Sequence, residues 1–437
     1  MTRALADGFR AELLSCAHRG GAFDCVSGLP LSLVPTEETS WLSHAQAYVE
    51  MKWPRAAAKS RRSMADALAT ATAALLEQGK DAPSAALMRE TLYGWGFNPS
   101  RQLDSAPQEV VNALEWMRRA SLPTSALADA AVARRVLDTL AVTVSGRAAA
   151  ATTVRRKRAV LYNALRYAVE LELLPANPLD RVQWSAPVVA RAIDRRVVVN
   201  PAQAEALLAA VANQGRRGPH LRAFFGCLYY GGLRPSEALA LRLGDCWLPD
   251  EGWGRLELAQ SSPQAGVAWT NDGAPRELRS LKRRAQREVR RVPVPPELVA
   301  LLRSHVDKFG TGPSGRLIRS ERGGSLQETA YGTVWRRARV AALTSTQAAS
   351  PLAARPYDLR HAAVSLWLNA GVPATEVAAR AGHSVAVLLS VYAGCLDGEE
   401  GVANDRISAA LTHARLTRAQ DRSQAAMGSS AGQLRDA

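Results

Sequence analysis

Residues 355–397 contain three residue types that can act on a phosphate group. Arg360 and His361 begin an amphipathic stretch, His383 follows a glycine, and Tyr392 comes nine positions after His383. Arginine can bind a phosphate through two parallel hydrogen bonds, histidine can donate to a phosphate oxygen, and a tyrosine hydroxyl can attack phosphorus. The stretch therefore predicts part of a phosphoryl-transfer site.

Three short helices are expected to position these side chains. Apolar residues recur at helical spacing after Arg360, and Gly371 ends that pattern. A second helix is expected from Pro373 to Arg380, and a third short apolar helix carries Tyr392. The site needs further residues from elsewhere in the chain.

A second arginine, Arg234, lies in the segment YYGGLRPSEALALRLGD at residues 229–245. It follows a Gly-Gly break and stands beside the expected start of a helix, where free N–H groups and the helix dipole favour an anion. The alternative is a capping arginine paired with Glu237 or Asp245.

Residues 276–298 form a basic tract that we expect to be hairpin-like. Residues 276–291 contain eight basic and two acidic side chains, a density that suits backbone phosphates. Lysine can be tuned to act as a general acid whereas arginine cannot, and Lys282 suits this role better than Lys308, which lies in a Gly-rich loop. The alternative is a solvated ribbon without chemistry. The DNA contacts expected here are Arg283, Arg284 and Arg287.

The composition favours a polyanionic partner. The 437 residues carry 55 basic and 40 acidic side chains, a formal charge of +15 and a pI near 10.1, and 47% of them are hydrophobic. No run of about 18 apolar residues or signal peptide occurs, so we expect a cytoplasmic, nucleoid-associated protein. The five cysteines lack metal-site spacing.

Helical periodicity dominates residues 40–183, with helices expected near 41–53, 61–78, 85–95, 107–120, 126–140 and 149–174. The last begins with a basic cluster that could contact phosphates or simply be a solvated face: Arg155, Arg156, Lys157 and Arg158. We expect an N-terminal extension at 1–39, a linker at 184–196, a second domain at 197–411 and a polar tail at 412–437. Within the second domain, Asn200 and Pro201 have the pattern of a helix start.

Taken together, five motifs closely resemble those of the tyrosine recombinases, the phage and plasmid integrases. They are LRPSEAL around Arg234, LKRR before VPVP, YDLRH around Arg360, AGHS around His383 and VYAG around Tyr392. The resemblance covers residues 197–411 specifically and 40–183 more loosely, and its wording is closest to integrases of actinobacterial mobile elements. It implies a mostly α fold with a small antiparallel β-sheet, in which a helical core-site DNA-binding domain precedes a mixed α+β catalytic domain.

The resemblance also implies roles. Arg234 and Arg360 would bind the scissile phosphate, Tyr392 would form a 3′-phosphotyrosyl bond, Lys282 would protonate the leaving 5′ oxygen, and His383 would donate to a phosphate oxygen. No cofactor or metal is required. The implied partners are duplex DNA attachment sites, a homotetramer assembled on DNA and an accessory excision factor, with no membrane.

Two positions depart from the family pattern. The usual histidine falls on Tyr357, a poor base with a reference pKa of about 10, to which we assign a supporting role. His361 would point about 100° away from Arg360 on a helix, so we do not expect it to substitute. The residues before position 40 are few for an arm-site domain, and we expect a truncated arm region or none.

The expected function is therefore site-specific integration or excision of a mobile element. The alternatives are a resolvase, a topoisomerase-like strand transferase, or a DNA-binding regulator with a decayed site, which Tyr357 keeps open. Metal-dependent hydrolysis is disfavoured because the histidines lack companion ligands at useful spacing.

Overall fold

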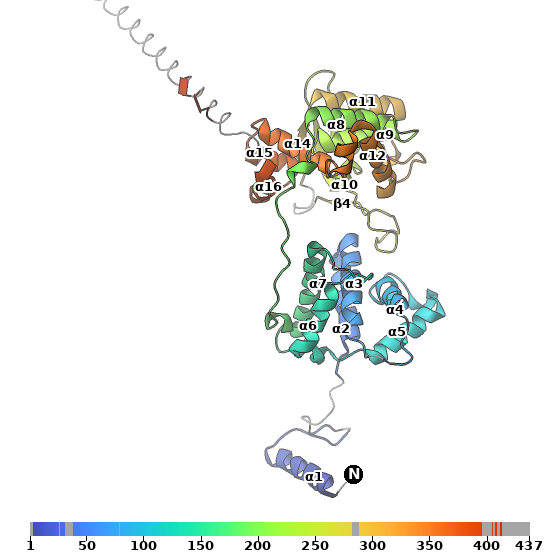
Figure 1. The fold of residues 1–437 in the computed structure, drawn as a ribbon. Coiled ribbons are helices and arrows are strands. Elements are labelled where there is room, and N and C mark those ends of the chain that lie inside the picture. Colours follow the sequence, from blue (N-terminus) through green and yellow to red (C-terminus); the bar gives the residue numbers. More distant parts are fainter. Residues whose placement is uncertain are drawn as a thin grey trace, which may run out of the picture. The chain divides into compact units, whose positions relative to one another are not determined.

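The chain folds into two compact units. The computed structural model describes residues 3–25, 27–30, 38–77, 79–281 and 288–395 and the single positions 404, 407, 408, 411 and 412. The first unit comprises Met1–Val189 with Ala265–Ala274, and the second comprises Ala190–Gln264 with Pro275–Ala437 (Figure 1). The chain is mostly helical with two small antiparallel sheets, which confirms the expected fold class. In the described residues, no helix has the length and apolarity needed to cross a membrane.

The first unit is helical, and the buried residues of its apolar core begin at Trp41. In chain order its helices are α1 (Arg3–His18), α2 (Trp41–Lys52), α3 (Ala58–Ala73), α4 (Ala85–Thr91), the π-helix η2 (Leu92–Gly96), α5 (Gln108–Ala120), α6 (Ala130–Leu140) and α7 (Ala151–Glu170). Short 3₁₀ turns join them: η1 (Trp53–Arg55), η3 (Leu103–Ser105), η4 (Thr124–Ala128) and η5 (Pro178–Asp180). Apolar stripes drive this packing; Trp41, for example, is fully buried, and its indole N–H donates to Thr72 Oγ1 at 2.9 Å.

The helix expected at 149–174 ends earlier than the sequence suggests. The last residue of α7 is Glu170, and Glu172 has a positive φ of 59°. A residue in the left-handed region cannot continue an α-helix. The prolines after position 174 therefore lie beyond a helix that has already ended.

Residues Ala265–Ala274 belong to the first unit although they come from the middle of the second stretch of chain. Trp269 is 5% exposed and packs beside Trp53 and Tyr93. Arg61 donates through Nη1 to Trp269 O at 3.1 Å and to Asn271 Oδ1 at 2.6 Å. The helical core is thus completed by a distant segment, which sequence periodicity did not indicate.

The helices of the second unit surround its own core. They are α8 (Pro201–Ala212), α9 (Gly218–Tyr229), α10 (Pro235–Ala238), α11 (Pro296–Phe309), α12 (Glu328–Ala342), α13 (Ser345–Ala349), α14 (Asp358–Asn369), α15 (Ala374–Ala381) and α16 (Val385–Tyr392). Figure 1 shows α8, α9, α11 and α12 side by side. As predicted, α8 begins with Asn200 as N-cap and Pro201 in the first turn.

Two antiparallel sheets lie in the second unit. Strands β1 (Cys246–Trp247), β2 (Gly254–Leu258) and β5 (Arg290–Val294) form one, and β3 (Gln260–Ser261) and β4 (Arg279–Ser280) form the other. The basic tract was expected to be a hairpin by itself, but β4 and β5 each pair with the preceding arm of the chain, at β3 and β2. In β5 burial alternates with the period of a strand, so Arg290 points inward. Lys282, Arg283, Arg284 and Arg287 lie outside the described residues.

Candidate active site

Three short helices hold the predicted arginine, histidine and tyrosine of the C-terminal motifs. A small apolar cluster joins α14, α15 and α16, with Val364, Val377, Leu388 and Tyr392 among its buried members. Ile193, from the connector before α8, packs against this cluster, and its N–H donates to Val391 O at 2.9 Å. The last turn of α16 thereby gains a partner for a carbonyl that a helix end leaves free.

Arg360 is completely buried at the centre of the site. Its guanidinium donates to Gly232 O and Ala381 O, and its Nη2 lies 3.0 Å from His383 Nε2. Because arginine remains protonated and only donates, His383 Nε2 must accept, which leaves the ring proton on Nδ1. Burial, with Arg360 and Arg234 nearby, lowers the pKa of His383 to about 3, so this ring is neutral at pH 7.

Glu237 connects the arginines of the site through its two carboxylate oxygens. Arg234 Nη1 donates to Oε1 at 2.7 Å, and Arg290 donates to both oxygens at 3.1 and 2.7 Å. Arg360 Nη1 lies 3.8 Å from Oε2. Burial alone would raise the pKa of Glu237, but Arg290, Arg360 and Arg234 outweigh it and lower the pKa to about 2. Three guanidinium groups around one carboxylate leave the cluster positively charged, as an anion site requires.

The pairing of Arg234 with Glu237 is the capping arrangement that the sequence left open. This pairing leaves other N–H groups of the Arg234 guanidinium available. Its Nη2 also donates to Gly382 O at 3.0 Å, and 29% of the side chain remains exposed. Because Arg290 satisfies the same carboxylate, Arg234 retains charge to offer a ligand. Capping and anion binding are therefore compatible here.

Among the described residues of the site, three buried N–H groups have no hydrogen-bond partner. They are Nε of Arg290, Nε of Arg360 and Nδ1 of His383. An unpaired donor in a buried position costs on the order of 1–3 kcal/mol, so these groups are costly unless a ligand oxygen meets them. The donors of Arg360 and His383 would suit the oxygens of a phosphate group.

Tyr392 lies beside this cluster with 1% of its surface exposed. Its hydroxyl is 3.0 Å from His361 Nδ1. Burial raises the pKa of Tyr392, whereas burial, with Arg360 and Arg355 nearby, lowers the pKa of His361 to about 4. At neutral pH the tyrosine is therefore protonated and the imidazole is not, so the hydroxyl donates to Nδ1.

The sequence did not indicate a role for His361, because a helix turns this residue about 100° away from Arg360. In the structure its ring faces Tyr392, with Nδ1 3.0 Å from the hydroxyl oxygen. A helical signal was present, because positions 357 and 361 are four apart and share one helix face. The rings of Tyr357 and His361 meet edge to face with centroids 5.0 Å apart, so an imidazole lies beside the position where the family pattern has its histidine.

The arginine of β5 was also missed as a site residue. Arg290 is 2% exposed, and its side chain ends between Glu237 and Ala381 O. The sequence contains eight basic residues between 276 and 291, and only the strand register decides which of them points inward.

The predicted DNA contacts of α7 differ in their surroundings. Arg155 and Arg156 are exposed. Lys157 is 6% exposed, and its Nζ donates to Thr70 Oγ1 at 2.8 Å. Arg158 lies over the Trp184 ring at 4.6 Å. Arg155 and Arg156 are consequently the members of this group that remain open to a partner.

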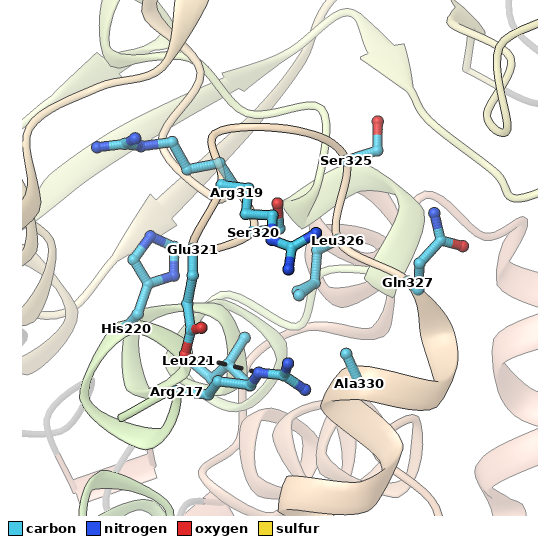
Figure 2. Close-up of a pocket in the computed structure, with 11 residues that line it drawn as sticks. Arg217, His220, Leu221, Arg319, Ser320, Glu321, Ser325, Leu326, Gln327 and Ala330 are labelled. Atoms are coloured by element: carbon cyan, nitrogen blue, oxygen red, sulfur yellow. Dashed lines mark ion pairs between the residues drawn. The ribbon is translucent and has the colours of Figure 1, made fainter. Parts of the chain in front are cut away.

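A pocket in the second unit contains none of the predicted catalytic residues. Figure 2 shows His220, Arg319 and Gln327 around it, with the ion pair of Arg217 and Glu321 at 3.6 Å on one side. Among the described residues, no group of three or more histidine, cysteine, aspartate or glutamate side chains could hold a metal ion. The arrangement around Arg360 is therefore the place where the predicted chemistry gathers.

Gly382 permits the close packing of this site, and its replacement by alanine is expected to disturb it. Its φ is +65°, and an added Cβ would lie 2.2 Å from Arg290 Nη1. Overpacking of this kind costs about 1–3 kcal/mol, and a displaced Arg290 would release Glu237. Gly382→Ala should lower the free energy of unfolding measured in urea.

The control is Gly215→Ala. Gly215 also has a positive φ, +54°, with nothing within 4 Å of an added Cβ, so alanine there meets an unfavourable φ without the clash. Equal losses in the two variants would contradict the role given to Arg290.

Comparison with known proteins identifies part of the chain. Residues 198–397 match the model described as the phage integrase family. Among curated proteins, none matches this chain. The match therefore covers the segment that contains Arg234, Glu237, Arg360, His383 and Tyr392.

Several solved structures resemble the fold at low sequence identity. A Tn1549 transposon integrase in complex with a circular intermediate DNA is 18% identical with a TM-score of 0.48, covering 65% of this chain and 89% of that one. XerH recombinase bound to a difH substrate is 12% identical with a TM-score of 0.42, covering 76% and 92%. A lambda integrase dimer bound to a core site is 14% identical with a TM-score of 0.40, covering 64% and 71%.

Proposed function

We propose, from the match of residues 198–397 to the phage integrase family, the tyrosine recombinases, that this chain is a site-specific DNA recombinase. It cuts and rejoins duplex DNA through a 3′-phosphotyrosyl intermediate, for integration or excision of a mobile element. The observation that carries the proposal is the buried cluster of arginines beside Tyr392, with unpaired donors on Arg360 and His383.

In this proposal the scissile phosphate enters the positive cluster. Arg234 and Arg360 hold its non-bridging oxygens, where negative charge builds up as phosphorus becomes five-coordinate. His383 donates from Nδ1, the nitrogen that Arg360 leaves free. Glu237 and Arg290 hold the two arginines in position without touching the DNA.

Tyr392 is the nucleophile of the proposed reaction. Its oxygen attacks phosphorus and the 5′ oxygen leaves, so the energy of the broken linkage is kept in the phosphotyrosine and rejoining needs no ATP. Lys282 is the proposed proton donor to the 5′ oxygen. Tyr357, at the start of α14, is proposed to support the site through its contact with His361.

The proposed partners follow from the reaction. Strand exchange requires two DNA attachment sites, so we expect a homotetramer on DNA, assisted by an accessory excision factor. Phosphate contacts are expected from Arg155, Arg156 and the tract containing Arg283, Arg284 and Arg287, with Lys157 and Arg158 the less accessible members of the α7 cluster. Such a protein would work in the cytoplasm, at the nucleoid.

The test is a covalent adduct. The wild-type chain and Tyr392→Phe would be incubated with nicked suicide DNA substrates carrying candidate attachment sites, in EDTA, and resolved by denaturing electrophoresis. We expect the wild-type chain to form an adduct and Tyr392→Phe to form none, since phenylalanine has no nucleophile. Tyr357→Phe is the matched control and should still form the adduct.

Two outcomes would contradict the proposal. An adduct that survives in Tyr392→Phe would remove Tyr392 from its role, and its loss in Tyr357→Phe alone would point to the other tyrosine. Sequence-specific DNA binding without any adduct from the wild-type chain would instead favour a regulator with a decayed site.

A further inference from the structure

We infer that His361 is the catalytic proton acceptor for Tyr392 during DNA cleavage. The inference rests on the proposed function and assigns a role that the sequence left without a convincing residue. Tyr357 occupies the position where the family pattern has a histidine, and a phenol is a poor base near neutral pH. An imidazole one helical turn further along α14 can do what that phenol cannot.

The geometry puts His361 in contact with the reacting atom. His361 Nδ1 lies 3.0 Å from the Tyr392 hydroxyl oxygen, within the range for direct proton transfer. Within the described residues, this is the hydrogen bond that the hydroxyl makes. The ring of His383 is also near, with its centroid 6.2 Å from that of Tyr392, but its Nε2 is engaged by Arg360. Of these two histidines, His361 is the one that makes a hydrogen bond with the Tyr392 hydroxyl.

The surroundings keep His361 able to accept a proton. The charged and titratable groups around it are the guanidinium groups of Arg355 and Arg360 and the phenol rings of Tyr357 and Tyr392. Burial, followed by the two arginines, lowers the pKa of His361 to about 4. The imidazole is therefore neutral over the physiological range, with Nδ1 free to accept and its proton on Nε2.

Tyr392 in turn needs an acceptor. It is 1% exposed, so bulk water cannot take its proton, and burial raises the pKa of its hydroxyl. A neutral phenol is a weak nucleophile, and a positioned base is the usual way to activate one. His361 fills this requirement without any movement of α14.

Cleavage moves one proton to His361 and exchanges one bond to phosphorus for another. A lone pair of the Tyr392 oxygen forms the bond to phosphorus while its proton passes to His361 Nδ1, giving an imidazolium. The bond from phosphorus to the 5′ oxygen breaks, its electron pair stays on that oxygen, and a separate acid, proposed above to be Lys282, protonates it. In rejoining, the 5′ oxygen attacks phosphorus while its proton returns to the amine of that acid. The bond from phosphorus to the Tyr392 oxygen breaks, and the imidazolium returns its proton to that oxygen. The bound phosphate, being anionic, stabilises the imidazolium during the intermediate.

The experiment measures single-turnover cleavage of a nicked suicide substrate by His361→Ala and His361→Asn. Alanine removes the hydrogen bond, whereas asparagine can keep a hydrogen-bond acceptor near the position of Nδ1 but cannot take a proton. Both are expected to reduce the rate about 10²–10⁴-fold, and added imidazole should restore part of the rate of His361→Ala. Ser390→Ala, at an exposed position of the helix that carries Tyr392, should remain close to the wild-type rate.

A second readout separates proton transfer from positioning. Tyr392 is replaced by a fluorinated tyrosine, whose hydroxyl loses its proton more easily, in the wild-type and in both His361 backgrounds. This substitution should raise the cleavage rate of the His361 variants by a much larger factor than it changes the rate of the wild-type enzyme. Thermal unfolding and DNA binding, measured on the same samples, identify a variant that has merely unfolded.

The outcomes distinguish the inference from the proposed function. His361 would not be the proton acceptor if His361→Asn cleaved DNA at the wild-type rate. The same would follow if the fluorinated tyrosine changed the rate equally in every background. Either result would leave a Tyr392-dependent adduct intact. The absence of any wild-type adduct would instead overturn the proposed function itself.

Discussion

Replacing Arg360 with lysine is expected to reduce the single-turnover rate of covalent adduct formation by roughly 10³-fold, the loss typical of an essential transition-state donor. Lysine keeps the charge, but it has neither the planar fork nor the reach to donate at once to Gly232 O, Ala381 O and His383. His383 would lose the partner that fixes its ring proton on Nδ1. One substitution would therefore disturb both side chains that we propose to bind the phosphate here, those at positions 360 and 383.

The matched control for this prediction is Arg355→Lys. Arg355 lies on the same segment, its side chain is 74% exposed, and it pairs with Asp358 at 3.5 Å. The same change there should alter the rate by less than about threefold, since lysine keeps the charge and the Arg355 side chain lies mostly in water. DNA binding measured by mobility shift should persist in both variants. A rate for Arg360→Lys near that of Arg355→Lys would show that charge alone suffices at position 360.

Replacing Glu237 with glutamine is expected to lower the free energy of unfolding by about 3–5 kcal/mol, the cost of removing one partner from a buried ion pair. The carboxylate is 2% exposed and accepts hydrogen bonds from Arg234 and Arg290. Without it, the guanidinium groups of the cluster repel one another in a buried site. Urea unfolding at neutral pH measures the loss, and DNA cleavage should fall with it because Arg234 and Arg360 lose their alignment.

The pH dependence of stability provides an independent test of the same carboxylate. The pKa of Glu237 is about 2 in the folded chain, below the usual value of 4.5 for a glutamate side chain. A carboxyl group with a lowered pKa contributes stability that is complete above the unfolded pKa and disappears as pH falls through the folded one. Between pH 4.5 and 2, the wild-type chain should thus lose more stability than Glu237→Gln, and the two should converge at the acid end.

Glu257→Gln is the control for both measurements on Glu237. Glu257 is 40% exposed and lies 3.4 Å from Arg255 and from Arg291, so it also has two arginine partners but retains water. Its loss should cost less than about 1 kcal/mol. If the two glutamine variants lose equal stability, the buried arrangement around Glu237 contributes nothing beyond a surface pair.

Much of the site could be predicted from sequence because its residues are set in helices with clear ends. Gly382 has the left-handed φ expected of a helix-ending glycine and places His383 against Arg360. Arg234 precedes a short helix as its Gly-Gly break and proline indicated. These local signals place each residue at the start or end of a helix. The order of the motifs then suggests which side chains lie close together.

The remainder depended on contacts between distant segments. Arg290 became a site residue because β5 pairs with β2 in a register that turns it inward, and no local pattern separates it from Arg291. His361 was overlooked because its partner, Tyr392, lies on another helix. The burial of Trp269 in the helical unit likewise depends on where Ala265–Ala274 returns in space.

The hydrogen bond from Ile193 to Val391 has a structural consequence. Residues that precede α8 in the chain are joined to the backbone of α16 one residue before Tyr392. They therefore help to fix the last turn of α16. Loss of this hydrogen bond would loosen the helix end that sets the distance between the Tyr392 hydroxyl and His361 Nδ1.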